Sequence, residues 1–398
     1  MLNPTGARLS VLNLLLLLLT FAFIPTAAIP PPKSDDGLVV HEWGTFTTVR
    51  NKEGQALLWR PLSFESDLPK FVYSVDRGQS WKANDLTYRT KSATPVTVRM
   101  ETPVIYFYAT QQTDARVRVG FPGIITEWYP QAQLKDRGIE WNRLRIFPDL
   151  RVELPHSLIE NHYYAARETD GSILELSGDE KNEYEKFLFY RGVGSFSLPV
   201  SLKLQADRVT VTNTSEEKQL HGILFENRSG QIGFTTLKLS EPEATIDRPT
   251  LGTPLADLRK ELRTMLIEAG LFEKEADAML NTWRDSWFEE GLRLFYVMPR
   301  TQTDTILPLK VEPEPKSIVR VMVGRTELIT PDAEKNVSAQ LLKLNDPSPS
   351  VRTAARKQID RYGRFVESIL TQISAAPPNP RVKAAAQRLL EELRQVGG

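Results

Sequence analysis

Residues Thr282 to Arg300 read TWRDSWFEEGLRLFYVMPR, and this stretch joins two kinds of structure. Its first half ends a helical pattern that places Trp283 and Trp287 one turn apart. Gly291 ends that pattern, and a dense apolar run from Leu292 to Met298 follows at once. Such a run is typical of a strand that is buried on both faces. The stretch therefore predicts that a helix packs where a central strand begins.

The chain before this stretch reads as β from Leu38 to about Leu239. Short apolar runs alternate with polar residues, as in Thr94 to Ala109, and turn signals such as NRSG at 227–230 separate them. Strands do not alternate with helices in this part, which argues against a parallel α/β sheet. The expected fold is mainly β with α, with an antiparallel β-sandwich-like body at residues 38–330.

A helical hairpin is expected to interrupt this body at residues 253–290. Leu255, Leu258 and Leu262 recur at helical spacing, and Gly270 ends the first helix. A second helical pattern runs from about Glu273 to Glu289. The body would then close with further strands after Leu292.

The N-terminal residues carry a targeting pattern. Arg8 precedes an apolar run from Val11 to Ile24, and small residues lead to Ala28. We expect a signal peptide at residues 1–28, a proline-rich linker at 29–37, and an exported protein in the periplasm or outside the cell. The alternative is a retained anchor, although the apolar run is shorter than the roughly 20 residues of a membrane span. After signal removal we expect no membrane span.

Composition excludes several classes of function. The 398 residues include 50 Lys and Arg, 50 Asp and Glu, and no cysteine. Balanced charge argues against a nucleic-acid partner, and without cysteine there is neither a disulfide nor thiolate chemistry. Zinc, phosphate-loop and dinucleotide motifs are absent from the sequence, and the six-residue spacing of His156 and His162 matches no zinc pattern. We therefore predict no metal site and no cofactor.

Four residues are the candidates for catalysis. His41 and Glu42 are adjacent in VVHEWGTF and could form an acid–base pair, or His41 could be a hydrogen-bonded residue at the start of a strand. Asp285 and Glu289 are four residues apart on the expected second helix, which places them on one face. Paired carboxylates near tryptophans are compatible with glycoside hydrolysis, whereas a solvated acidic face is the structural alternative.

Two segments near the C-terminus are similar to each other. NDPSPSVRTAARKQIDRYG begins at Asn345, and NPRVKAAAQRLLEEL begins at Asn379. Val351 and Arg352 align with Val382 and Lys383 at an offset of 31 residues. These segments resemble short HEAT-type repeats. The resemblance implies a helical segment at residues 331–398 that serves interaction and not catalysis.

The same helices are basic. Residues 351–398 hold nine Lys or Arg and four Asp or Glu, a net charge of 9 − 4 = +5. The expected binding residues are Arg352, Arg356, Lys383 and Arg388. The partner would be an envelope protein or an anionic polymer, and the alternative is a merely solvated face. We predict an exported, non-catalytic binding protein, and the alternative is a secreted hydrolase that acts on glycans.

Overall fold

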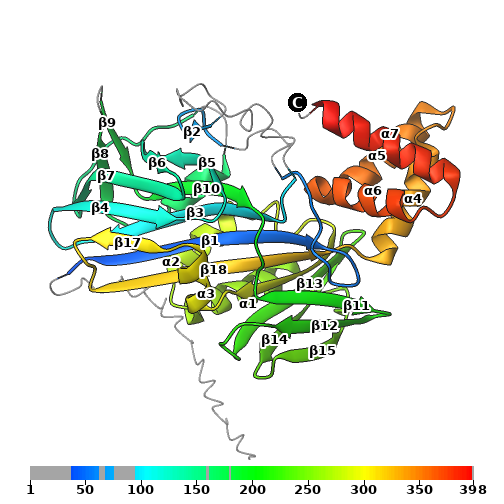
Figure 1. The fold of residues 1–398 in the computed structure, drawn as a ribbon, viewed down its shortest axis with the longest axis horizontal. Coiled ribbons are helices and arrows are strands. Elements are labelled where there is room, and N and C mark those ends of the chain that lie inside the picture. Colours follow the sequence, from blue (N-terminus) through cyan, green and yellow to red (C-terminus); the bar gives the residue numbers. More distant parts are fainter. Residues whose placement is uncertain (1–36, 62–67, 76–94, 158–160, 179–180, 397–398) are drawn as a thin grey trace, which may run out of the picture. The chain divides into compact units, whose positions relative to one another are not determined.

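The computed structural model describes residues 37–61, 68–75, 95–157, 161–178 and 181–396. The signal peptide predicted at residues 1–28, and the predicted linker up to residue 36, lie outside the described residues. The described chain is mainly β, with several antiparallel sheets and a group of helices at its C-terminal end (Figure 1). Within it, no helix is both long enough and apolar enough to cross a membrane.

A nine-stranded sheet is the centre of the fold. From edge to edge its strands are β14 (Gln231–Leu239), β13 (Leu220–Arg228), β16 (Gly291–Val297), β18 (Ser317–Leu328), β1 (Val39–Arg50), β3 (Val98–Tyr108), β10 (Leu188–Gly194), β5 (Ile124–Tyr129) and β2 (Tyr73–Ser74). The run after Gly291 therefore forms an interior strand, as predicted. β13 and β14 form a hairpin at the NRSG sequence, in which Asn227 and Arg228 end β13 and Ser229 and Gly230 form the turn.

One strand pair in this sheet differs from the antiparallel expectation. β1 and β18 are parallel, and their register runs from Val39 opposite Ser317 to Arg50 opposite Leu328. Parallel partners need a long connection between them, and almost the whole body lies between these two strands. A hydrophobic pattern over a few residues predicts which side chains are buried. It does not predict which distant strand pairs with the segment.

Two smaller sheets pack with the large one. The first consists of β17 (Leu309–Glu312), β4 (Thr113–Gly120), β7 (Gly138–Phe147), β8 (Ile173–Ser177) and β9 (Asn182–Glu185), with β6 (Gln133–Lys135) paired to β7. The second consists of β11 (Val200–Gln205), β12 (Arg208–Asn213) and β15 (Glu243–Asp247). Phe46, Trp141 and Val211 come from the three sheets and belong to one buried apolar cluster. That cluster covers one face of the nine-stranded sheet.

Helices α1 (Leu255–Glu268) and α2 (Glu273–Thr282) belong to a second cluster, on the other face. Trp283 and Trp287 are both buried there, and the Trp287 ring lies 4.9 Å from the ring of Phe295 in β16. The second helix ends at Thr282, seven residues before the predicted end. The chain turns through residues 283–290 so that Trp287 reaches the sheet, and Gly291 takes a left-handed φ of 132° that favours glycine.

The remaining helices are short or C-terminal. They are η2 (His162–Arg167), α3 (Arg300–Ile306), α4 (Pro331–Lys343), α5 (Pro349–Asp360), η3 (Gly363–Phe365), α6 (Val366–Ala375) and α7 (Pro380–Val396). Thr330 caps α4, because its hydroxyl accepts a hydrogen bond from the backbone N–H of Ala333 (3.2 Å). The last four α-helices share a third apolar cluster with Val49 and Trp59 of the body. Through these contacts the described residues form one compact unit.

Candidate functional site

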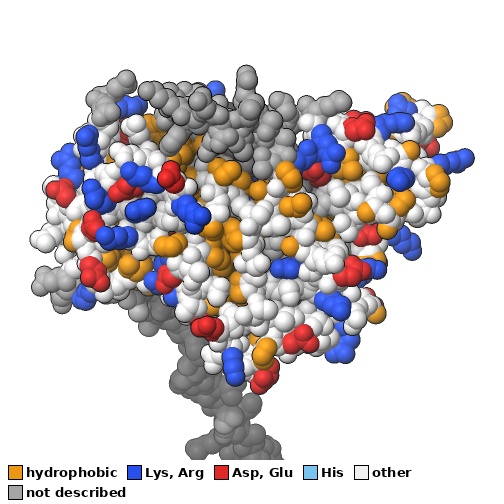
Figure 2. Space-filling model, viewed as in Figure 1, with side chains coloured by type: hydrophobic (Ala, Val, Ile, Leu, Met, Phe, Trp, Pro, Cys, Tyr) orange, Lys and Arg blue, Asp and Glu red, His pale blue; other side chains and the backbone are white. Residues whose placement is uncertain are grey.

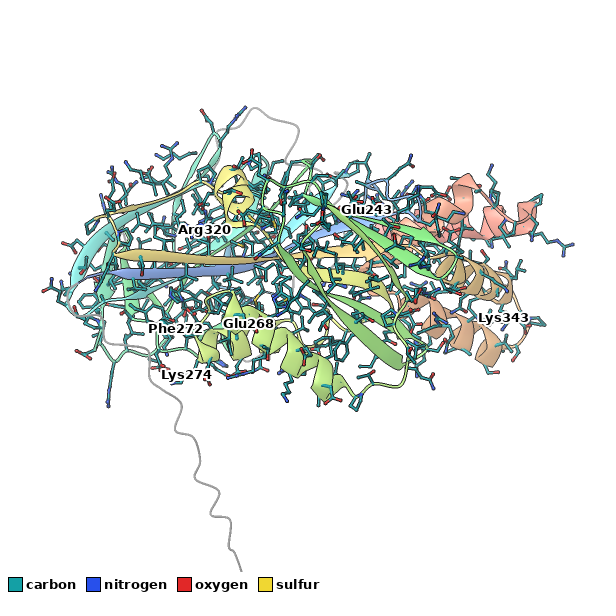
Figure 3. All side chains as sticks on the ribbon, turned by 90° about the horizontal axis from the view of Figure 1, so that it is seen from below. Glu243, Glu268, Phe272, Lys274, Arg320 and Lys343 are labelled. Atoms are coloured by element: carbon teal, nitrogen blue, oxygen red, sulfur yellow. The ribbon has the colours of Figure 1, made fainter. Side chains whose placement is uncertain are left out.

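His41 and Glu42 lie side by side on β1, and their side chains point to opposite faces of the sheet. Successive residues of a strand alternate between the two faces. His41 stacks on Phe272 beside α2, whereas Glu42 contacts Arg320 of β18. Figure 3 shows Phe272 and Arg320 on opposite sides of the ribbon of β1 and β18. The two neighbours therefore do not form the acid–base pair that the sequence suggested.

The His41 side chain belongs to a closed hydrogen-bonded cluster. Its Nδ1 donates to Glu275 Oε2 (2.8 Å), and the Tyr108 hydroxyl donates to Glu275 Oε1 (2.7 Å). The backbone N–H of Phe272 donates to the same carboxylate (2.8 Å). Burial raises the pKa of Tyr108, and Glu275 raises it further, so the hydroxyl stays protonated and donates. The cluster ties the start of α2 to β1 and β3.

Glu42 is held as tightly on the other face. It accepts hydrogen bonds from the Tyr190 hydroxyl (2.5 Å) and from Arg320 Nε (2.5 Å). Arg320 also donates to Asp304 (2.7 Å). Burial lowers the pKa of Arg320, but Glu42 and Tyr190 outweigh that effect and the net pKa is raised. A fully buried carboxylate with two strong donors is suited to joining β1, β10 and β18, and its position gives no access to a substrate.

Asp285 and Glu289 lie beyond the end of α2, so the helical spacing that would align them is lost. Asp285 is exposed and accepts from His162 Nε2 (2.8 Å). Glu289 is mostly buried and lies 3.5 Å from Arg325 Nη2. The two carboxylates thus have different basic partners, His162 and Arg325. The arrangement lends no support to a paired-carboxylate site, and the glycan-hydrolase alternative stays a prediction.

Three of the four predicted binding residues converge on one hollow of about 340 Å³. Arg352 and Arg356 are four residues apart on α5, and Arg388 reaches the same hollow from α7. Lys383 is exposed but does not line it. The lining comes entirely from α4, α5, α7 and the turn after α4. The predicted basic face is therefore divided. Arg352, Arg356 and Arg388 line one hollow, and Lys383 does not line it.

Hydrogen bonds orient these arginines without using all their donors. Arg352 Nη1 donates to the carbonyl oxygens of Asp346 (2.7 Å) and Pro347 (3.0 Å). Arg356 Nε donates to the Asp360 carboxylate (2.8 Å). Arg388 Nη1 donates to the side-chain oxygen of Asn345 (3.3 Å). A guanidinium carries five N–H groups, so each arginine keeps donors beyond these contacts within the described structure.

The floor of the hollow is apolar. Leu341, Leu344, Ala385 and Leu389 line it, and Leu341 and Leu389 are buried. Glu392 is the carboxylate among the lining residues. The lining therefore holds three guanidinium groups, one carboxylate, the Asn345 amide and the Thr353 hydroxyl beside four apolar side chains. Such a site can bind an anion. Among the described residues, no group of three His, Asp or Glu side chains is placed to hold a metal ion.

Glu275, the partner of His41, was not among the predicted residues. A local signal exists, because Glu275 is the third residue of its helix and can reach back to the N–H of Phe272. That signal predicts the cap and not the histidine, which lies 234 residues earlier in the chain. Asn345 was missed as the partner of Arg388 for the same reason.

Comparisons with known proteins give no family for the chain. No family model matches it, and no curated protein matches it. Among solved structures, the yeast delta-COP-I mu-homology domain is similar over 74% of this chain and 98% of that chain, with 7% identity and a TM-score of 0.27. A likeness at that level carries no argument about fold or function.

Proposed function

We propose that the chain is an exported, non-catalytic protein that binds an anionic partner at its C-terminal helices. The observation that carries the proposal is the convergence of Arg352, Arg356 and Arg388 on one hollow. Guanidinium groups pair with carboxylates and phosphates through paired, charge-assisted hydrogen bonds. Three of them around an apolar base make an anion the preferred ligand.

The architecture that we propose for this binder is a β-sandwich-like body with a HEAT-like tail. The apolar cluster shared by the three sheets supports the first part. For the tail, α5 begins at Pro349 and α7 at Pro380, so Val351 and Val382 occupy the same third position of their helices. Helix pairs α4–α5 and α6–α7 would then stack as short repeats and present the basic residues on one side.

The charge distribution supports attraction of an anion by the hollow and not by the net charge of the whole protein. The whole chain has no net charge, and Figure 2 shows basic and acidic side chains interspersed over the visible face. An anion would therefore be drawn to the hollow over short distances, within about 10 Å at 0.1 M salt. Binding should weaken steeply as the salt concentration rises.

Export is the part of the proposal that rests on the sequence of residues 1–28. The polymer or protein that binds would then lie in the periplasm or outside the cell. Sequencing the N-terminus of the protein from its producing cell tests this part. A chain that begins near Ile29 is expected, and an intact N-terminus on exported material would contradict cleavage.

Charge reversal tests the binding itself. The test variant changes Arg352, Arg356, Lys383 and Arg388 to Glu. A matched control reverses four exposed basic residues of the sheets, Arg116, Arg208, Lys238 and Lys310. On immobilised polyglutamate the test variant should elute at lower salt than the control and the unchanged protein. Equal elution of both variants would contradict the proposal.

A further inference from the structure

The proposed function does not specify the chemical class of the anion. The volume and the lining of the hollow favour one class. Resting on that function, we infer that the hollow binds an acidic peptide segment in which an apolar side chain lies between two carboxylates. The hollow of about 340 Å³ holds the volume of roughly eleven water molecules. That is enough for a leucine-sized side chain together with its flanking carboxylates.

The apolar floor is what separates a peptide from other polyanions. Asn345 and Thr353 can bond a polar group at the edge of the hollow, but Leu341, Leu344, Ala385 and Leu389 would leave a sugar hydroxyl or a phosphate oxygen that covers them without hydrogen bonds. An apolar side chain gains free energy by covering the same surface. A ligand that fills the whole hollow must therefore combine charge with an apolar group.

The walls of the hollow set where the charges must lie. Arg352 and Arg356 line it from α5, and Arg388 lines it from α7, so the cations come from two different helices. Two carboxylates on either side of one apolar side chain can pair with both walls. Glu392 also lines the hollow, so a chain that carries charge at every unit should bind more weakly than a segment with one apolar side chain between its carboxylates. This arrangement favours an acidic peptide over polyphosphate or an anionic polysaccharide.

The test uses the full chain and a short set of labelled peptides. Each peptide carries one leucine between two glutamates, with the glutamates one to three residues from the leucine, and each has a matched peptide with serine in place of leucine. Polyphosphate and polyglutamate are the polymer probes. Fluorescence anisotropy at low salt should show at least one leucine peptide binding about tenfold more tightly than its serine counterpart.

Two protein variants separate the charge from the apolar floor. Arg388→Ala removes a cation and should weaken binding of every anionic probe by about tenfold. Ala385→Met fills part of the hollow without changing charge, and it should remove the preference for the leucine peptide over its serine counterpart. An unchanged melting temperature shows that each variant is folded. Leu344→Gln, a partly buried position on the same floor, provides a second test of the apolar contact.

The outcomes distinguish the two proposals. Equal binding of leucine and serine peptides, with dependence on Arg388, would overturn the peptide inference and leave the anion-binding function standing. Tighter binding of polyphosphate than of any peptide would likewise overturn the inference in favour of a polymer. Absence of binding to every probe at low salt would overturn both. A leucine preference that Ala385→Met removes supports the inference.

Discussion

The C-terminal helices carry two sets of arginines that differ in what surrounds them. Arg361 and Arg364, after α5, form ion pairs with Glu290 (2.9 Å) and Glu101 (2.7 Å) of the body, and both carboxylates are buried. Arg356 and Arg388, by contrast, are exposed beside the hollow. The inner set is used to hold the helices on the sheet, and the outer set keeps donors for a ligand. A count of net charge treats the two sets as one.

The seam between helices and body is densely charged. Arg325 of β18 stacks under the Phe365 ring at 4.9 Å, and Arg60 pairs with Glu367 of α6. Burial and the nearby Arg293 together lower the pKa of Arg325 to about 10, although Glu327 and Glu289 act in the opposite direction. Buried pairs of this kind add specificity more than net stability, but removing one partner leaves an unpaired buried charge. The inner set should therefore respond strongly to mutation and the outer set weakly.

The largest effect is expected when the C-terminal helices lose the body altogether. Residues 331–398 expressed alone should lack a cooperative thermal transition, because their apolar cluster includes Val49, Trp59 and Ile329. Circular dichroism on heating measures this. A sharp transition in the isolated segment would show that the inner face is not needed for folding.

Next comes the tryptophan that joins the hairpin to the sheet. Trp287→Ala should lower the free energy of unfolding by about 3–5 kcal/mol, because a fully buried ring against Phe295 is lost. Urea denaturation gives the value. Trp283→Ala should have an effect of the same kind, since that ring stacks on Trp287 at 6.4 Å. Unchanged stability in both variants would mean that the two rings do not form a core.

Removing an inner arginine tests the seam directly. Arg364→Ala leaves the buried Glu101 carboxylate without its 2.7 Å partner. The free energy of unfolding should fall by up to about 3–5 kcal/mol, and by less if the nearby Arg99 compensates for part of the lost charge. The matched change on the outer face, Arg356→Ala, should stay within about 0.5 kcal/mol. Urea denaturation of both variants measures the contrast. Equal costs would remove the distinction between the two faces.

Acid should weaken the same seam. Burial raises the pKa of Glu101, but Arg364 and Arg99 outweigh it, so its net pKa lies below the ordinary value of 4.5. A carboxyl group whose folded pKa is depressed contributes stability that is present above the unfolded pKa and is lost as pH falls through the folded pKa. Below about pH 4.5 the unchanged protein should therefore lose stability more steeply than Glu101→Gln.

The comparison with Glu101→Gln is needed because Glu327 has the opposite tendency. Burial raises the pKa of Glu327, so its protonation favours the folded state as pH falls. Subtracting the two pH profiles isolates the contribution of Glu101. Parallel profiles from pH 7 to pH 3 would contradict a role for the Glu101–Arg364 pair.

The smallest effect on stability is expected from reversing the charge of the outer arginines. Arg352→Glu with Arg388→Glu should change the melting temperature little, because substitutions on the surface usually change the free energy of unfolding by about 0.5 kcal/mol or less. Arg352 is the more sensitive of the two, since it is half-buried and donates to two backbone carbonyls. A large fall in the melting temperature would show that these side chains stabilise the fold and are not held in reserve for a ligand.

Local patterns determined which segments became helix or strand. The β13–β14 hairpin, α1 and the strand after Gly291 follow from hydrophobic period, turn residues and a glycine, all of which act within a few residues. The basic character of α5 and α7 likewise follows directly from their sequences. The prediction that α2 extends to Glu289 was wrong, because the contact of Trp287 with the sheet overrides helical spacing.

Tertiary structure alone decided the neighbours of these segments. The parallel pairing of β1 with β18, the contact of His41 with Glu275, and the meeting of Arg356 with Arg388 at one hollow all join residues that are distant in the sequence. The sequence determined that the last helices were basic. Only packing divided their arginines into buried ion pairs and a surface set, because burial depends on which element covers a side chain and not on its neighbours in the chain.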